Sequence, residues 1–388
     1  MNEQTKGLIK NLPLRIILTE HGINFFIKHN KKLNRFRMAD ELEEYGIYLD
    51  TFSPASIQRM LLINYISKLE ISRAEFVSKR QEIMDLTKLL VFGILYKQLD
   101  NRVFKILIES NLIKSWNRTN PGSILDERTN INENYLEKIM KQNENKVQGV
   151  KKTLLAPIFE RINNDPNLLP EEKKLKYLMC ERFLNNLRPS IWFILSRFQA
   201  SEDYNAVLKD IRECVVEYLE KTRIAEYLSL MIMELVVNAE NTNMQKFAQR
   251  VYKDAINLES LFFDQNMRAR ILREMENQKE YLYLTWKMGA KSSSISTRVK
   301  LQVTLYNRES EYREVKQIID DKKGLNLKKK SLSDFYKEAP DQIVNNELGL
   351  YYLSYLSEAC EKVNVRFDSF VNQIQKSDLT VITMTLSF

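Results

Sequence analysis

The sequence contains little glycine or proline, and this scarcity limits the architectures available to it. Only 9 Gly and 8 Pro occur in 388 residues, and no Gly lies between Gly149 and Gly289. Because glycine lowers helix stability, its absence favours long helices in that interval. The length predicts two domains. The 44% hydrophobic and 28% charged residues are typical of a globular protein with sizeable cores.

Cysteines and long apolar runs are also few. The three cysteines are far apart in the chain, which excludes a zinc motif and a disulfide framework; they are Cys180, Cys214 and Cys360. The sequence has no run of roughly 18 apolar residues that would span a membrane. Its first residues lack the apolar core and cleavage site of a signal peptide. We therefore expect a cytoplasmic protein without a membrane span.

The positive charge is concentrated in the first half of the chain. Residues 1–200 hold 32 Lys and Arg against 23 Asp and Glu, whereas residues 201–388 hold 27 against 28. A basic run at 28–37, KHNKKLNRFR, precedes an acidic run at 40–44, DELEE. Such a basic run suits a nucleic-acid backbone. The alternative is that the two runs pair with each other at the surface. The side chains in question are Lys31, Lys32, Arg35 and Arg37, with Phe36 among them.

Residues 1–199 show helical periodicity almost throughout and predict an all-helical region. A first helix is expected at 8–30. Ser53 is suited to cap a second helix, with Pro54 at its first position. The polar stretch NRTNPGSILDERTNINEN at 117–134 is typical of a loop, and it predicts a break between two subdomains.

The pattern changes near residue 200. The runs EYLYLTWKMG at 280–289 and RVKLQVTLYN at 298–307 alternate apolar and polar residues and predict a β-hairpin. A helix follows at NELGLYYLSYLSEACEKV, and DLTVITMTLSF closes the chain with a strand pattern. The order predicts a second domain at 200–388, an α/β sandwich with helices on one face of a mixed sheet.

One stretch in this domain carries the candidate chemistry: EYLSLMIMELVVNAENTNMQK at 226–246. Glu234 and Asn238 are four residues apart and project from the same helix face. One interpretation is that these polar groups end a buried helix and bind backbone groups of the next loop. The other is that they line a site for a metal ion and phosphates.

Three segments together resemble the GHKL family of ATPases, which includes histidine kinases and DNA gyrase. MELVVNAEN at 233–241 is similar to the family's N-box helix. NNELGLYYLSYLSEA at 345–359 is similar to its second glycine box and the following helix. TVITMTLSF at 380–388 is similar to its closing strand. The resemblance covers residues 200–388 and implies a GHKL-like fold there.

The resemblance also implies roles for individual residues. Glu234 corresponds to the catalytic base, and Asn238 corresponds to the ligand of the Mg²⁺ ion that bridges the ATP phosphates. An amide oxygen is a suitable ligand for this hard cation, and a carboxylate one turn away can accept a proton. Four further residues correspond to the rest of the nucleotide-binding site: Asn307 at the adenine, Gly349 at the phosphates, and Lys328 and Lys330 in the lid. ATP and Mg²⁺ are the cofactors implied.

The sequence departs from the family's pattern at both glycine boxes. Asn307 stands where the family has Asp, and no Gly follows it; the second box keeps only Gly349. The histidines His21 and His29 do not lie in a phosphoacceptor box. The resemblance thus implies a signalling or regulatory protein with a divergent ATPase domain and a protein partner. The alternatives are an interaction scaffold that has lost nucleotide binding, or a nucleic-acid-associated regulator that uses residues 1–200.

Overall fold

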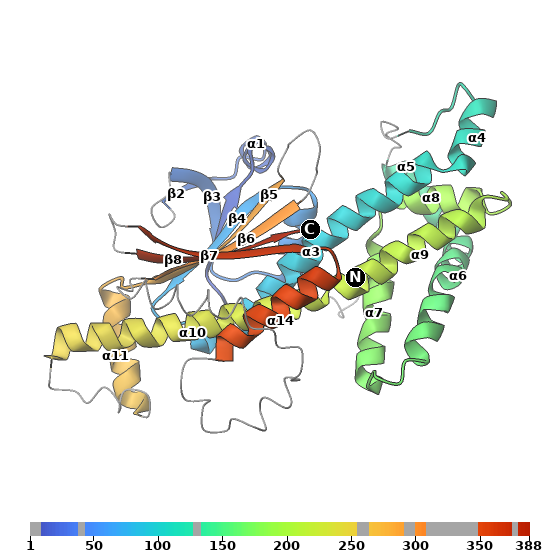
Figure 1. The fold of residues 1–388 in the computed structure, drawn as a ribbon. Coiled ribbons are helices and arrows are strands. Elements are labelled where there is room, and N and C mark those ends of the chain that lie inside the picture. The colour runs from blue at the N-terminus through green and yellow to red at the C-terminus, as the bar shows by residue number, and fades with distance from the viewer. Residues whose placement is uncertain are drawn as a thin grey trace. The chain divides into compact units, whose positions relative to one another are not determined.

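The computed structural model describes residues 9–37, 43–126, 133–253, 264–290, 299–307, 348–374 and 379–388. They form two compact units. The first comprises residues 1–94 and 223–388, and the second comprises residues 95–222. In Figure 1 the first unit is blue at one end of the chain and yellow to red at the other, and the second is cyan to green.

A single sheet forms the centre of the first unit. Its described strands are β1 (Leu14–Leu18), β2 (Asn34–Arg37), β3 (Glu43–Leu49), β4 (Ile66–Arg73), β5 (Leu282–Ala290), β6 (Val299–Asn307), β7 (Arg366–Ile374) and β8 (Leu379–Ser387). They form an 8-stranded sheet in the order β2-β3-β1-β4-β5-β6-β8-β7. Every neighbouring pair is antiparallel. The prediction of a mixed sheet is therefore wrong.

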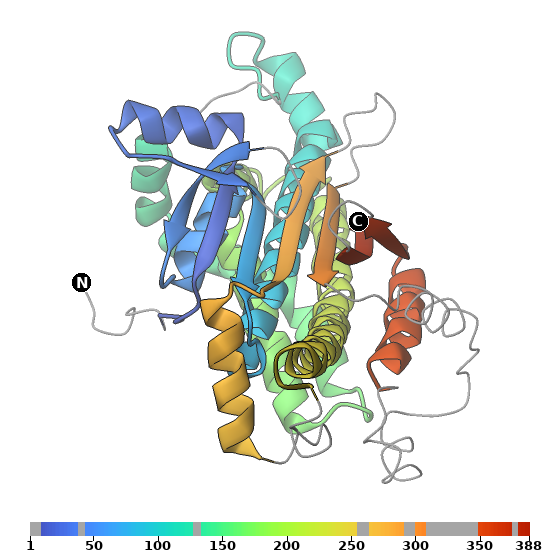
Figure 2. The same ribbon diagram turned by 90° about the vertical axis from the view of Figure 1, so that its left-hand side faces the viewer.

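The described helices of the first unit lie in the connections between these strands. They are α1 (Glu20–Lys28), α2 (Pro54–Leu62), the 3-10 turn η2 (Val77–Lys79), the beginning of α3 (Arg80–Glu109), α10 (Arg223–Tyr252), α11 (Gln265–Asn277) and α14 (Leu348–Lys362). Helix α10 contacts β6, and α14 contacts both α10 and β7. Figure 2 shows these two helices against one face of the sheet.

An apolar row crosses one face of the sheet. Register places five side chains directly opposite one another along the row, and each is at most 1% exposed: Ile16, Leu69, Trp286, Val303 and Met384. The opposite face carries Arg15, Glu70, Thr285 and Thr304 in the same register. This difference between the faces fixes the register, because a slip of one strand by one residue would move its apolar side chains to the opposite face.

The prediction of an all-helical N-terminal region is also wrong, because β1 to β4 belong to the sheet. Strand β1 is a short apolar run, LRIIL, and periodicity alone does not separate such a strand from a buried helix. Strand β4 is not recognisable from the sequence pattern, because a helical pattern directly precedes it. Helix α2 ends at Leu62, and Asn64 adopts a left-handed conformation with φ 60° before β4 begins. Asn tolerates this conformation better than most residues do.

Other sequence predictions are confirmed. Ser53 caps α2, since its hydroxyl accepts a hydrogen bond from the Ser56 backbone N–H at 3.2 Å, and Pro54 is the first helical residue. The predicted hairpin is present as β5 and β6. The predicted C-terminal helix and last strand are α14 and β8.

All the described secondary-structure elements of the second unit are helices. It consists of the rest of α3 with α4 (Asn111–Thr119), α5 (Glu133–Gln142), α6 (Glu144–Asn163), α7 (Pro170–Asn186), α8 (Pro189–Arg197) and α9 (Tyr204–Lys221). Asp100 of α3 accepts bonds from both the backbone N–H and the guanidinium of Arg188, at 3.0 and 2.7 Å. Because Arg188 is the residue that caps α8, this pair fixes the beginning of α8 to α3.

Candidate functional site

The candidate site centres on one stripe of α10. This helix has 30 residues and continues to Tyr252, well past the polar cluster that the sequence placed at its end. Glu234 and Asn238 follow Tyr227 by 7 and 11 residues, which are close to two and three whole helical turns. The three side chains therefore leave the helix in nearly the same direction. Glu234 and Asn238 are both half-buried.

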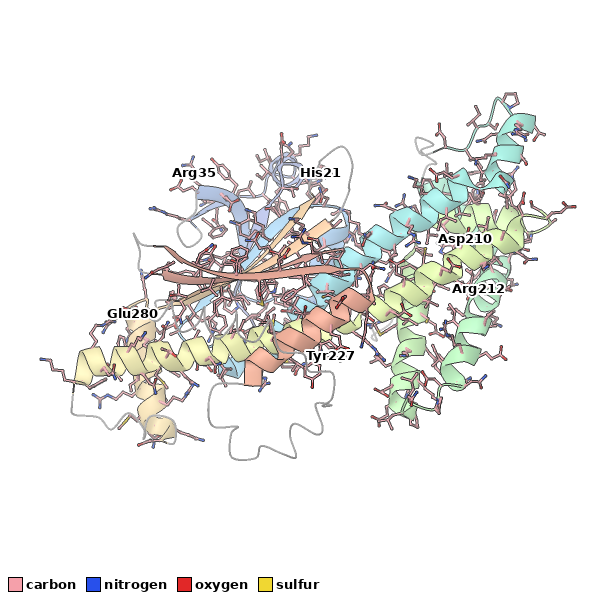
Figure 3. All side chains as sticks on the ribbon, in the orientation of Figure 1. His21, Arg35, Asp210, Arg212, Tyr227 and Glu280 are labelled. Atoms are coloured by element: carbon pink, nitrogen blue, oxygen red, sulfur yellow. The ribbon has the colours of Figure 1, made fainter. Side chains whose placement is uncertain are left out.

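This stripe of α10 points towards α14. The rings of Tyr227 and Tyr355 of α14 stack, with centroids 6.3 Å apart and an interplanar angle of 15°. Figure 1 shows the two helices running in opposite directions, and Figure 3 labels Tyr227 beside α14. Gly349 precedes Tyr355 by six residues, a rise of about 9 Å. The same rise along α10 from Tyr227 ends at Met233, so two antiparallel helices in contact at Tyr227 and Tyr355 are expected to place the start of α14 near the level of Glu234.

The Glu234 carboxylate is partly desolvated and has one described cation near it. Nη2 of Arg80, the first residue of α3, lies 3.9 Å from Glu234 Oε1. Burial raises the pKa of Glu234 above its ordinary value, and the positive charge of Arg80 opposes that shift. Asn238 accepts a bond from Thr242 Oγ1 at 3.0 Å, but through its backbone carbonyl. This bond does not involve the side-chain amide of Asn238.

The remaining predicted site residues fall in different places. Asn307 is the last residue of β6, is 2% exposed and pairs in register with Thr380 of β8. Gly349 is the second residue of α14. Lys328 and Lys330 lie outside the described residues, as does most of the second glycine box. Glu234 and Asn238 thus share one face of α10, and a role for either of them, or for Gly349, at a nucleotide remains a prediction.

Sequence reasoning missed the most strongly bonded carboxylate of α10. Glu240 is fully buried, and its Oε2 accepts bonds from the backbone N–H groups of Phe76 and Val77 at 2.7 and 3.2 Å. Its Oε1 forms an ion pair with Arg268 of α11. Burial raises the pKa of Glu240, while these bonds and Arg268 oppose the shift. No local pattern reveals this role, because the backbone partners precede Glu240 by 164 and 163 residues.

The basic run at 28–37 is exposed in the structure. Lys31, Lys32, Arg35 and Arg37 are all exposed, and the last two lie on β2, an edge strand of the sheet. Figure 3 labels Arg35 at this edge. Its guanidinium lies over the ring of Tyr45, 5.4 Å from the centroid, and 3.7 Å from Glu43. A cation of this run therefore does pair with the following acidic segment, as the second interpretation predicts.

Two types of site receive no support within the described ranges. None of the described His, Cys, Asp and Glu side chains gather into a group of three or more that could hold a metal ion. Likewise, no helix in the described part of the chain is long and apolar enough to cross a membrane. Any Mg²⁺ ion at Asn238 would accordingly need oxygen ligands from the phosphates and from water, as is usual for this ion.

Comparison with known proteins gives a family but no activity. Residues 5–388 match the model of a family of unknown function, DUF8084. The chain belongs to the DUF8084 family. A relative in Treponema pallidum (strain Nichols), described as "Uncharacterized protein", is 40% identical over 389 residues, which cover 100% of both chains. No solved structure matches the chain. The family therefore extends over both units, because the matched residues include nearly the whole chain.

Proposed function

We propose that the chain is a regulatory protein that binds ATP with Mg²⁺ between α10 and α14. The observation that carries this proposal is the packing of α10 against α14, with Glu234 and Asn238 on the same stripe of α10 as Tyr227, whose ring stacks on Tyr355 of α14. The first turn of a helix presents unpaired backbone N–H groups and a partial positive charge, and both favour phosphate. The fold of the first unit differs from the sandwich expected, so the proposal rests on this pair of helices.

Each residue of the proposed site has one role. The amide oxygen of Asn238 is a ligand of Mg²⁺, whose other ligands are phosphate oxygens and water. The backbone around Gly349 receives the phosphates, since glycine permits a close approach. Glu234 is the proton acceptor, and burial suits it to this role because a raised pKa lies closer to neutral pH. The resemblance assigns Asn307, at the end of β6, to the base and Lys328 and Lys330 to the phosphates, and the two lysines lie outside the described residues.

Calorimetric titration of the full chain with ATP and Mg²⁺ tests the proposal. We expect Asn238→Ala to weaken Mg²⁺-dependent ATP binding by at least tenfold, about 1.4 kcal/mol. The matched control is Asn277→Ala, because Asn277 is an exposed residue at the end of α11. The control should bind as the unaltered chain does. Absence of heat with ATP, ADP and a non-hydrolysable analogue, each with Mg²⁺, would reject the proposal and favour an interaction scaffold without nucleotide.

A further inference from the structure

Arg80 is a cation at the proposed site that belongs to none of the motifs in the sequence. Its guanidinium approaches Glu234 to 3.9 Å, which is an ion-pair distance but too long for a hydrogen bond. The Arg80 side chain is 51% exposed, whereas that of Glu234 is 26% exposed. The pair is thus loose and open to solvent on the side of the arginine.

The backbone leading to Arg80 is held far more firmly than its side chain. The Ala74 N–H donates to Glu276 of α11 at 3.3 Å, and the N–H groups of Phe76 and Val77 donate to Glu240 of α10. Three backbone donors of this short connection are therefore bound to carboxylates of other helices. Arg80 begins α3 directly afterwards, so its backbone is fixed while its guanidinium reaches the surface of α10.

We propose that Arg80 binds the terminal phosphate of the nucleotide held between α10 and α14, and that it leaves Glu234 when it does so. This inference rests on the proposed function. A proton acceptor for attack on the terminal phosphate lies next to that phosphate, so a cation already beside Glu234 is within reach of it. Guanidinium groups bind phosphate through two parallel hydrogen bonds, which a single contact at 3.9 Å cannot match.

The two states of Arg80 differ in the anionic group that its guanidinium faces, which is the Glu234 carboxylate in one state and the terminal phosphate in the other. Without ligand, Arg80 faces the partly desolvated Glu234 carboxylate and favours its ionised form. With ATP bound, the guanidinium turns to the phosphate. The site then distinguishes nucleotides by their phosphate number, because ADP lacks the group that Arg80 binds. Arg80 thereby supplies a positive contact in a site whose second glycine box retains a single glycine.

The test compares ATP and ADP binding, each with Mg²⁺, by calorimetric titration of the full chain. Arg80→Ala should weaken ATP binding at least tenfold and ADP binding less than threefold, and Arg80→Lys should recover part of the ATP affinity. Arg273→Ala is the matched control, since Arg273 is an exposed arginine of α11 and its loss changes the net charge equally. It should alter neither affinity.

A second variant tests the inference independently of any folding defect in Arg80→Ala. Glu234→Gln removes the charge that competes for Arg80, so ATP should bind this variant at least as tightly as the unaltered chain. Equal losses of ATP and ADP affinity in Arg80→Ala, or weaker ATP binding by Glu234→Gln, would overturn the inference. ATP binding that Arg80→Ala leaves unchanged overturns the inference alone. Absence of ATP binding by the unaltered chain overturns the proposed function as well.

Discussion

Replacement of Glu240 is expected to destabilise the first unit more than replacement of any exposed carboxylate of α10. Its side chain is fully buried and accepts from two backbone N–H groups, those of Phe76 and Val77. It also pairs with Arg268, whose side chain is 23% exposed. The carboxylate therefore joins α10 to α11 and to the connection between β4 and α3.

The expected loss follows from what Glu240→Ala leaves behind. An orphaned buried donor costs about 1–3 kcal/mol, and breaking a buried ion pair from one side costs about 3–5 kcal/mol. The two contributions overlap, because one carboxylate serves all three partners. We expect a total of about 3–5 kcal/mol. Glu240→Gln keeps one acceptor oxygen for the backbone but turns an amide NH₂ towards Arg268, so it should cost about 1–2 kcal/mol.

Urea unfolding followed by tryptophan fluorescence measures the loss of stability in the first unit, which contains Glu240. The chain has three tryptophans, and only Trp286 lies in the first unit, where it is fully buried. Replacing Trp116 and Trp192 by Phe leaves Trp286 as the sole reporter. Glu226→Ala is the control, since Glu226 is exposed on the same helix and should change stability by less than about 0.5 kcal/mol. A loss below about 1 kcal/mol for Glu240→Ala would refute the reasoning.

Three further predictions concern packing, thiols and pH. Gly46→Ala should destabilise the sheet by about 1–3 kcal/mol, because a Cβ there would lie 2.1 Å from the Ile16 carbonyl oxygen. Gly289→Ala, with nothing within 4 Å, should leave the urea midpoint unchanged. All three cysteines should resist a thiol reagent at pH 8 until denaturant is added, because burial raises their pKa values: Cys180 and Cys360 to about 12 and Cys214 to about 11. Rapid reaction of any thiol without denaturant would contradict this. Since the folded pKa of Glu234 is raised above 4.5, its contribution to stability is greatest below that pH and falls as pH rises through the folded pKa. Glu234→Gln should reduce this decline, and an unchanged decline would count against the raised pKa.

The parts of the fold that could be predicted are those with a strong local pattern. Strands β5, β6 and β8 alternate in residue type, and Ser53 with Pro54 signals the beginning of α2. Strands β1 and β4 could not be recognised, because each is short or follows directly on a helical pattern. Their identity depends on pairing across the sheet, such as that of β4 with β5 more than 200 residues later. Local periodicity carries no information about such partners.

The same distinction holds for the candidate site. The spacing of Glu234 and Asn238 predicted that they share a helix face, and they lie on the stripe of α10 that faces α14. The sequence did not predict the contacts that Arg80 and Glu240 make. Arg80 reaches Glu234 from α3, and Glu240 is bound by backbone groups of residues 76 and 77. These contacts join segments distant in the chain, so only the folded sheet and its helices bring them together.

The buried carboxylate of Glu240 and the half-buried carboxylate of Glu234 differ in which groups bind their oxygens, and this difference separates stability from binding. Both Glu240 oxygens already accept hydrogen bonds from Phe76, Val77 and Arg268. A ligand could therefore bind Glu240 only by displacing these hydrogen bonds. Glu234, six residues earlier, has Arg80 at 3.9 Å and remains 26% exposed. Variants of Glu240 should therefore lower the stability of the first unit strongly. Variants at Glu234 should change ligand binding or proton transfer with little loss of stability, because no described backbone donor depends on that carboxylate.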